Sequence, residues 1–350
     1  MIDIGLAALF ILLIVMLFIL LSLFFYLMVK KHINNQLRQK INELKEIYRL
    51  KMFHYLQTGE LHFLDSNQSE EKFIALIELL QEYSNVLDDS AVKKRISCIA
   101  KNHLTKYIEK QLKQRRWSLR MNALYLIEDF YMDHLRLTLH DIFKKKKTTN
   151  AEKTQILKLL AMFQDEKIVE YIKNLNHNIS DFSLLSIFSN MEEDHIDRFV
   201  ASFDELLLRL QYILIDTIGR KQLINHHSLL QRLVLQGEEE VRIRSLKAFA
   251  NIGVPIDKKY VSPFFNSDSW QIRMMATKVA GVQRMEDYKG KLIERLSDRE
   301  FVVRSEAAKA ILRFKDGVDI LTKVTEESED MFAKDMAFEW LEKERGGYSY

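Results

Sequence analysis

The residues that could bind a metal ion or move a proton include two acid–histidine pairs, and their spacing suits neither task. The pairs Asp133-His134 and His140-Asp141 lie about two helical turns apart. A zinc site needs three or four ligands that converge on one point, and the sequence has no His-Glu-x-x-His or Cys-x-x-Cys pattern to supply them. We therefore interpret both pairs as helix-surface residues and expect no metal site.

The other reactive side chains are equally isolated. His226 and His227 are adjacent, so on a helix their rings point about 100° apart and cannot easily act together. Cys98 is the single cysteine and no motif surrounds it, which is typical of a small buried side chain rather than of a nucleophile. No glycine-rich phosphate loop is present. The sequence thus predicts a protein that is not an enzyme, with no catalytic residue and no cofactor.

A cluster of basic residues offers different chemistry, the binding of anions. Between residues 93 and 120 the only acidic residue is Glu109, and the basic residues are Lys93, Lys94, Arg95, Lys101, Lys106, Lys110, Lys113, Arg115, Arg116 and Arg120. Apolar residues recur through the same stretch at Val92, Ile96, Ile99, Leu104, Ile108 and Leu112. This pattern predicts amphipathic helices that bury the apolar stripe and carry the cations on the outer face.

Three interpretations of this basic face remain open. It is a solvated helix surface, a contact for anionic lipid headgroups or a membrane-bound partner, or a nucleic-acid contact. Nucleic acid is disfavoured because the pI of 8.6 is modest and aromatic residues do not interleave with the cations. The residues that we expect at an anionic surface are Lys30, Lys31, Arg38, Lys40, Lys106, Lys110, Lys113 and Arg116.

The chain begins with an apolar segment that predicts a transmembrane helix over residues 5–29. The segment has no charged residue, and its 25 residues would extend roughly 37 Å as a helix, enough to cross a hydrocarbon core of about 30 Å. A cleaved signal peptide is the alternative. It is disfavoured because no basic residue precedes the apolar run, the run is too long, and no Ala-x-Ala site follows it.

The charges that flank this segment predict its orientation. No basic residue precedes it, whereas seven follow it closely: Lys30, Lys31, Arg38, Lys40, Lys45, Arg49 and Lys51. Basic residues favour the cytoplasmic side, so we expect the N-terminus outside the cell membrane and the bulk of the chain in the cytoplasm. A single cysteine agrees with a reducing compartment.

The segment that follows, residues 30–68, is predicted to be a basic helical stalk and linker. Leu37, Ile41, Leu44 and Tyr48 form a heptad seam. The seam is only two heptads long, which favours a stalk that continues out of the membrane over a dimerising coiled coil. The case for a dimer through the stalk is therefore weak.

The remaining sequence predicts an all-α fold built from repeats. Two prolines and ten glycines in 350 residues favour long helices over a turn-rich β fold. Repeat markers lie 29, 31 and 30 residues apart at Arg244, Arg273, Arg304 and Lys334. Residues three and six positions after each marker are small or apolar, with Lys247 as the exception, and these positions share one helical face.

The same phase continues upstream with more variation. The upstream markers are Arg120, Lys153, Asp181 and Arg209. A mean step near thirty residues leaves room for two short helices in each repeat. One helical hairpin cannot bury its apolar face alone, so stacked neighbours would form a continuous core, which predicts an α-solenoid.

This pattern resembles the HEAT-repeat family of helical-hairpin solenoids. An acidic residue precedes an apolar–basic pair by five or six positions, and small residues follow it. The acids Glu238, Asp268, Asp298 and Glu329 precede Ile243-Arg244, Ile272-Arg273, Val303-Arg304 and Ala333-Lys334. The resemblance is good over 237–340, moderate at 117–130 and thin between them. It implies that these acid and basic side chains form a structural ladder between repeats.

Together these patterns predict a single-pass membrane protein with a cytoplasmic HEAT-like solenoid. The expected parts are a short external N-terminus (1–4), a transmembrane helix (5–29), the stalk (30–68), the solenoid (69–344) and a flexible tail (345–350). Fold-level analogy predicts a scaffold or adaptor for a membrane-associated protein partner, in a synthesis, secretion or signalling assembly. The alternatives are an enzyme or lyase-like helper on the same repeats, or a HEAT-like nucleic-acid-binding protein.

Overall fold

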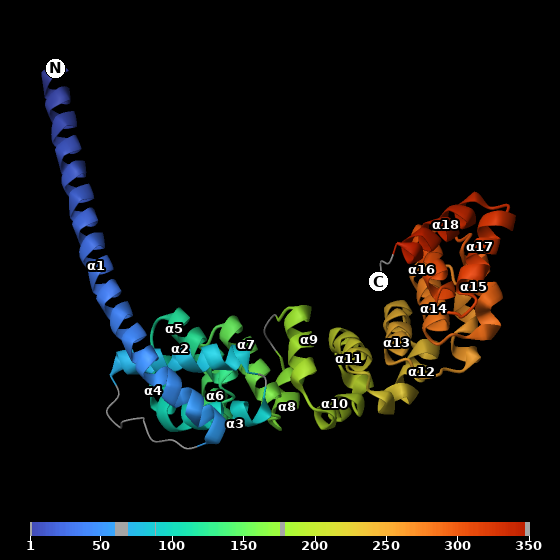
Figure 1. Cartoon of the computed structure of the whole chain (residues 1–350), viewed down its shortest axis with the longest axis horizontal. Helices are drawn as coiled ribbons and strands as arrows, with labels where there is room; N and C mark the ends of the chain where they lie inside the picture. The colour runs from blue at the N-terminus through green and yellow to red at the C-terminus, as the bar shows by residue number, and fades with distance from the viewer. Residues whose placement is uncertain (1, 60–68, 88, 176–178, 347–350) are drawn as a thin grey trace. The chain divides into compact units, whose positions relative to one another are not determined.

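Helices account for all the regular structure in the computed structural model, which describes residues 2–59, 69–87, 89–175 and 179–346 (Figure 1). No strand occurs within those ranges. The chain divides into two compact units, unit 1 (Met1–Thr148) and unit 2 (Thr149–Tyr350). The all-α prediction is confirmed.

The described residues of unit 1 form six α-helices, with a π-helical turn at Ala100–Leu104 and a 3-10 turn at Asp133–Leu135. The helices are α1 (Ile2–Thr58), α2 (Glu70–Val86), α3 (Ser90–Ile99), α4 (Thr105–Leu112), α5 (Trp117–Asp129) and α6 (Arg136–Phe143). Residues 60–68 of the predicted stalk lie outside the described residues.

Helix α1 is one uninterrupted helix with two different halves. From Ala8 to Lys40 every side chain is exposed. From Ile41 onward the helix packs against α2 and α3, and Ile41, Met52 and Leu56 are almost fully buried. The seam residue Ile41 is therefore covered by helices of its own chain.

Five residues of the apolar stripe predicted between residues 92 and 112 are buried as expected, and Val92 is half-buried. Ile96, Ile99, Leu104, Ile108 and Leu112 are all less than a tenth exposed. Residues spaced four apart do not stay on one face of an α-helix, because four residues turn through about 400°, roughly 40° more than one full turn. The wider π-helical turn that separates α3 from α4 offsets this drift and keeps the stripe on one side.

Unit 2 is a stack of helical repeats. The first helices of successive repeats are α7 (Asn150–Met162), α9 (Asp181–Asn190), α11 (Leu208–Lys221), α13 (Glu239–Ile252), α14 (Trp270–Val282), α16 (Phe301–Ile311) and α18 (Met331–Arg345). Each first helix packs against the next one along the chain. This arrangement confirms the helical solenoid as the fold class of this part of the chain.

Second helices or short turns follow most of the first helices. They are α8 (Ile168–Lys173), α10 (Glu193–Val200), α12 (His227–Gln236), the 3-10 turns Lys258–Tyr260 and Ser262–Asn266, α15 (Lys289–Arg295) and α17 (Gly317–Glu327). Further 3-10 turns lie at Phe203–Glu205, Ile224–His226 and Glu286–Tyr288. The predicted tail beyond Gly346 lies outside the described residues.

Hydrogen bonds to the turn before four of the first helices, α11, α13, α14 and α16, define the register of these repeats. Arg273 and Arg304 each donate to the carbonyls six and five residues earlier. Gln211 and Arg242 donate to the carbonyls eight and five residues earlier. The four residues are spaced by 31 positions throughout.

Two of the predicted markers, Arg209 and Arg244, are therefore wrong by two residues. Two positions turn a helix through about 200°, so Arg242 faces the preceding turn whereas Arg244 faces α11, where it pairs with Asp216. The correction also removes the exception at Lys247. The residues three and six positions after Arg242 are Ser245 and Ala248, and both are buried.

A residue with left-handed backbone follows α5 of unit 1 and four of the first helices of unit 2. Tyr131, Gln164, Gln222, Gly253 and Arg284 have φ between 48° and 72°. Such a residue commonly ends a helix because its N–H can bond back to the last turn. Gln222, Gly253 and Arg284 each lie eleven positions after the hydrogen-bonding residue of their repeat, which independently supports the corrected register.

Close backbone contacts hold neighbouring first helices together. A Cβ atom added to Gly219 would lie 2.8 Å from Ala248 Cα, and one added to Gly281 would lie 2.4 Å from Ala310 Cβ. Ala276 and Ala307, which were predicted to lie on the packed face, are fully buried. Small residues at these positions let the helices approach closely.

Candidate functional site

The first half of α1 is the most distinctive surface of unit 1. Its apolar side chains from Leu9 to Val29 are 46% exposed or more. This is the one helix within the described residues that is long and apolar enough to cross a membrane, judged by length and composition. The same criterion is met by some signal sequences near an N-terminus.

The predicted anionic-contact residues of α1 follow this half directly. Lys30 lies over the ring of Tyr26, with Nζ 5.7 Å from the ring centroid. Lys31 and Lys40 are exposed. Arg38 is different, because its guanidinium is paired with Glu78 of α2 at 2.5 Å. The structure gives Arg38 a role in packing α1 against α2.

Two further cations of the predicted stalk belong to the same network. Lys45, which is buried, contacts Glu78 at 3.0 Å and Glu82 at 2.5 Å, and Arg49 contacts Glu82 at 3.1 Å. Burial alone would lower the pKa of Lys45, but hydrogen bonds to Glu82 and Glu78 outweigh it and raise that pKa. These cations therefore stabilise the α1–α2 contact.

The cations of α4 form the second part of the predicted surface, and they remain available. Lys106, Lys110 and Lys113 are exposed at i, i+4 and i+7 positions and so share one face. Arg116, also exposed, precedes the first residue of α5. Within the described ranges none of these four has a carboxylate at ion-pair distance. We name Lys106, Lys110, Lys113 and Arg116 the α4 basic face.

Contacts along α1 place the α4 basic face toward the apolar half. Arg95 of α3 donates to the carbonyl of Leu56, near the far end of α1. From there the chain returns, so that Tyr107 of α4 stacks on Phe73 of α2 with ring centroids 5.0 Å apart.

Ion pairs show that α2 runs in the same direction as α1, since Arg38 pairs with Glu78 and Arg49 pairs with Glu82. Phe73 precedes Glu78 and therefore lies toward the exposed part of α1. Tyr107, which stacks on Phe73, and its neighbour Lys106 thus lie toward the apolar half of α1 and away from Thr58.

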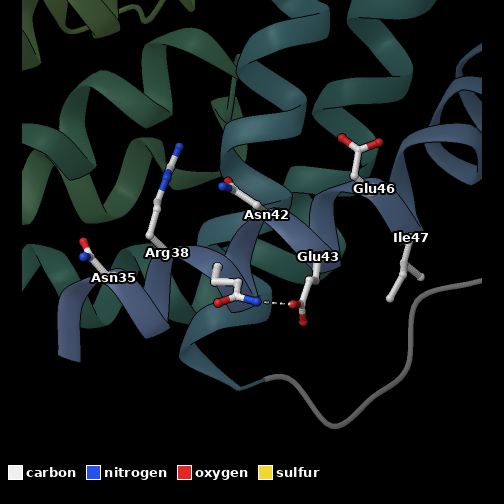
Figure 2. A pocket seen from close by; sticks show the side chains of 7 residues that line it. Asn35, Arg38, Asn42, Glu43, Glu46 and Ile47 are labelled. Atoms are coloured by element: carbon white, nitrogen blue, oxygen red, sulfur yellow. Dashed lines mark hydrogen bonds between the residues drawn. The ribbon is translucent and has the colours of Figure 1, made fainter. Parts of the chain in front are cut away.

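An open concavity of about 770 Å³ lies along the polar part of α1 (Figure 2). Its lining residues are Asn35, Arg38, Gln39, Asn42, Glu43, Glu46 and Ile47. Gln39 donates a hydrogen bond to Glu43 at 3.1 Å, one turn along the helix. The lining is a shallow strip of one helix with both signs of charge, which does not provide the converging groups of a catalytic site.

A second concavity, of about 460 Å³, lies between α2, α4 and α5. Ile74, Ile77 and Leu126 give it an apolar floor, and Tyr107 lies at its side. Burial raises the pKa of Tyr107, so its hydroxyl stays protonated at neutral pH. This groove suits an apolar side chain better than a charged ligand.

The structure corrects the interpretation of the acid–histidine pairs as helix-surface residues, because His140 is buried, at 7% exposure, and His134 is half-buried. Asp133 pairs with Arg136 at 3.2 Å, and His134 Nε2 lies 2.8 Å from the hydroxyl of Thr105. Burial lowers the pKa of His134, and the charge of Lys101 adds to this effect. The expectation that Cys98 is buried is wrong, since it is exposed. Ile96 and Ile99 already fill the inner face of α3.

One cluster that sequence reasoning missed lies in unit 2. Glu193 and Asp197 lie one turn apart on α10, and His226 ends the 3-10 turn before α12. A ligand atom from each of the three lies within 4.8 Å of the other two, and within the described part of the chain this is the group that could hold a metal ion. The expectation had paired His226 only with its neighbour His227.

No family model and no curated protein matches this chain. Two engineered proteins of known structure resemble it at 14% identity, one with a TM-score of 0.37 over 85% of this chain and 87% of its own, the other with 0.26 over 69% and 96%. Human deoxyhypusine hydroxylase in complex with glycerol resembles it at 13% identity, with a TM-score of 0.27 over 71% and 99%.

Proposed function

We propose that this protein is a membrane-anchored, HEAT-like helical scaffold whose first unit rests near an anionic membrane surface and whose solenoid holds a protein partner. The carrying observation is the continuity of α1, which runs without a break from exposed apolar residues into the packed core of unit 1. A hydrophobic helix of this length is stable in a bilayer, where its backbone polar groups are satisfied internally. The cytoplasmic orientation rests on the basic residues after Val29.

The geometry of α1 sets how near unit 1 lies to the bilayer. Ile41, the first buried residue, is 12 residues beyond Val29, which corresponds to about 18 Å along the helix. The interfacial region accounts for roughly 5–7 Å of that length on each side. The packed part of unit 1 therefore begins roughly 10 Å beyond the headgroups, and an ordinary tilt of the helix reduces this gap.

At this short distance the unpaired cations of the α4 basic face can attract anionic lipid headgroups. Electrostatic attraction to anionic lipid acts within a Debye length of about 8–10 Å, and each Lys or Arg near the surface contributes on the order of 1 kcal/mol. The α4 basic face lies at the end of unit 1 toward the apolar half. Arg38, Lys45 and Arg49 contribute less because carboxylates of α2 already neutralise them.

A topology experiment tests the anchor. A reporter that is active only outside the cytoplasm, fused after Tyr350, should stay inactive, and one that is active only in the cytoplasm should work. Carbonate extraction should leave the full-length protein in the membrane pellet. Release into the supernatant, or reporter activity outside, would contradict the proposal.

A vesicle experiment tests the basic face. A fragment that lacks residues 1–29 should fold, because the apolar window of α1 makes no buried contact. It should bind vesicles that contain phosphatidylserine at low salt and dissociate as salt rises. Reversing Lys106, Lys110 and Lys113 to Glu should abolish this binding.

The matched control makes the same charge change on the exposed loop lysines. Reversal of Lys144, Lys145 and Lys146 to Glu alters the net charge equally within unit 1. Binding should be lost in the α4 variant and be largely retained in the loop variant. Equal loss in both would show that net charge alone attracts the fragment, and no binding by the unmodified fragment would refute a role for lipid contact.

A further inference from the structure

We propose that Glu193, Asp197 and His226 form a binding site for a divalent transition-metal ion, of which Zn²⁺ fits the donors best. Glu193 and Asp197 come from α10, the second helix of one repeat, and His226 precedes α12, the second helix of the next. An ion at this position would join two neighbouring repeats of unit 2. The inference does not depend on the membrane function proposed above.

The buried histidine provides the first argument. His226 is only 8% exposed, and its Nε2 atom lies 3.0 Å from Asp197 Oδ1. Nevertheless Nε2 makes no hydrogen bond of acceptable geometry. A buried polar atom without a hydrogen-bond partner is unfavourable and calls for an explanation. A metal ion bound by Nε2 and the two carboxylates would explain it, because the nitrogen of a neutral imidazole is a common metal ligand.

The spacing of the donors provides the second argument. Zn²⁺ binds nitrogen and oxygen donors at about 2.0–2.2 Å, so neighbouring donors of a tetrahedral ion lie roughly 3.4 Å apart. Nε2 and the Asp197 oxygen, at 3.0 Å, already lie close to this separation. The largest separation in the group is no more than 4.8 Å. A small rotation of the Glu193 side chain, which lies on the partly exposed side, would close the remaining gap.

The environment of Glu193 fixes one of its oxygens. Asn225, the residue before His226, donates a hydrogen bond from Nδ2 to Glu193 Oε1 at 2.8 Å. This bond orients the carboxylate and leaves its other oxygen for the ion. Hydrogen bonds of this kind position metal ligands in known sites. His195 does not take part, because it lies two positions from each acid and so projects from the opposite side of α10.

The donor set selects the class of ion. One imidazole and two carboxylates suit Zn²⁺ and similar first-row ions, whereas Ca²⁺ and Mg²⁺ prefer oxygen donors alone. Three protein donors leave at least one coordination position for water. This number of donors is that of an open zinc site, because a closed structural site has a fourth protein ligand.

A metal titration of the full-length protein in detergent micelles tests the proposal. After removal of bound metal with EDTA and of EDTA by dialysis, Zn²⁺ binding is measured by calorimetry and Co²⁺ binding by visible absorption. We expect one site per chain that binds both ions and does not bind Mg²⁺ with comparable affinity. Asp197→Asn and Glu193→Gln should each weaken Zn²⁺ binding at least about tenfold.

The control uses another exposed acid of α10. Asp194→Asn removes the same charge from the same helix and should leave the affinity unchanged. Because Asp194 and Asp197 are both exposed, neither change should unfold the protein, which circular dichroism will verify. The proposal is overturned if Zn²⁺ does not bind, if Mg²⁺ binds as tightly, or if Asp197→Asn and Glu193→Gln bind Zn²⁺ as well as Asp194→Asn does.

Discussion

Arg273 and Asp298 form a two-point ion pair between successive repeats, in which Nε donates to Oδ2 and a terminal guanidinium nitrogen donates to Oδ1, both at 2.7 Å. Their side chains are 5% and 3% exposed. Arg273 lies on α14, and Asp298 lies in the turn before α16. Of the acids expected in an inter-repeat ladder, Asp298 fulfils that role; other pairs between repeats use Asp181 with Arg209 and Asp204 with Arg232.

Replacing Asp298 with Asn should destabilise unit 2 substantially. The change leaves the Arg273 guanidinium buried without its counter-charge, a situation that costs about 3–5 kcal/mol. The measurement is the free energy of unfolding from a urea titration. Asp204→Asn breaks the exposed pair with Arg232 and should cost less than about 1 kcal/mol. Similar losses in the two variants would contradict the buried role of Asp298.

The same ion pair should make the stability depend on acid. Burial alone would raise the pKa of Asp298, but hydrogen bonds from Arg273 and from the Glu300 N–H outweigh it and lower that pKa. A lowered pKa in the folded state gives stability that is present above the unfolded value, near 3.9 for Asp, and is lost as the pH falls through the folded value. The free energy of unfolding should therefore decrease below about pH 4. The decrease should be smaller in Asp298→Asn, and an unchanged slope would argue against this assignment.

Two glycine substitutions should have opposite effects. A methyl group on Gly281 would meet Ala310 Cβ at 2.4 Å, so Gly281→Ala should push α14 from α16 and cost roughly 1–3 kcal/mol. Around Gly290 of α15 the space is open, so Gly290→Ala should be neutral or stabilise by up to about 1 kcal/mol. Thermal unfolding of both variants measures the difference. Equal tolerance would show that the first helices do not approach as closely as described.

At the helix ends with left-handed backbone, replacing glycine should lower the stability and introducing glycine should raise it. Gly253 has φ of 72° with open space around it, so Gly253→Ala adds only backbone strain, about 1 kcal/mol. Arg284 is an exposed residue with φ of 48°, so Arg284→Gly should relieve similar strain and stabilise by about 0.5–1 kcal/mol. Chemical denaturation detects both shifts. A destabilised Arg284→Gly variant would indicate that the Arg284 side chain makes a stabilising contact of its own.

Much of the fold was predictable because helix patterning is local. The scarcity of glycine and proline and the spacing of small residues predicted helical repeats, and Ala276 and Ala307 are buried as that pattern requires. At the start of α7 the Thr149 hydroxyl accepts from the Glu152 N–H and the Glu152 carboxylate accepts from the Thr149 N–H, a capping box between residues three positions apart. Such contacts lie within a few residues of each other, so the sequence is enough to reveal them.

The exact register of the repeats was harder to predict because either of two arginines could be the marker residue. Arg242 and Arg244 are two positions apart, and residue type alone does not show which one faces the preceding turn. The misfit at Lys247 was the available signal, since Ser245 and Ala248 restore small residues at the packed positions. Gln211 was missed because the marker was defined as a basic residue, whereas here a side-chain amide donates the hydrogen bonds that arginine donates in the other repeats.

The candidate sites depend on contacts between distant residues, and these limited what the sequence could show. Composition identified the basic residues, but only the folded arrangement separates Arg38, paired with Glu78, from the unpaired Lys106. Glu193 and Asp197 at i, i+4 spacing, with His226 about one repeat later, were a detectable pattern. It becomes recognisable only once the repeat length is used to align residues of neighbouring second helices.

In the proposed anchored state, the uninterrupted α1 couples the tilt of its membrane-spanning half to the position of unit 1. From Val29 to Thr58 the helix extends roughly 44 Å, so a tilt of about 20° in the membrane displaces its far end sideways by about 15 Å. A change in bilayer thickness alters that tilt, because an apolar helix leans to match the hydrocarbon layer. In the proposed anchored state, a thicker or thinner bilayer would therefore change how far unit 1 leans toward the lipid.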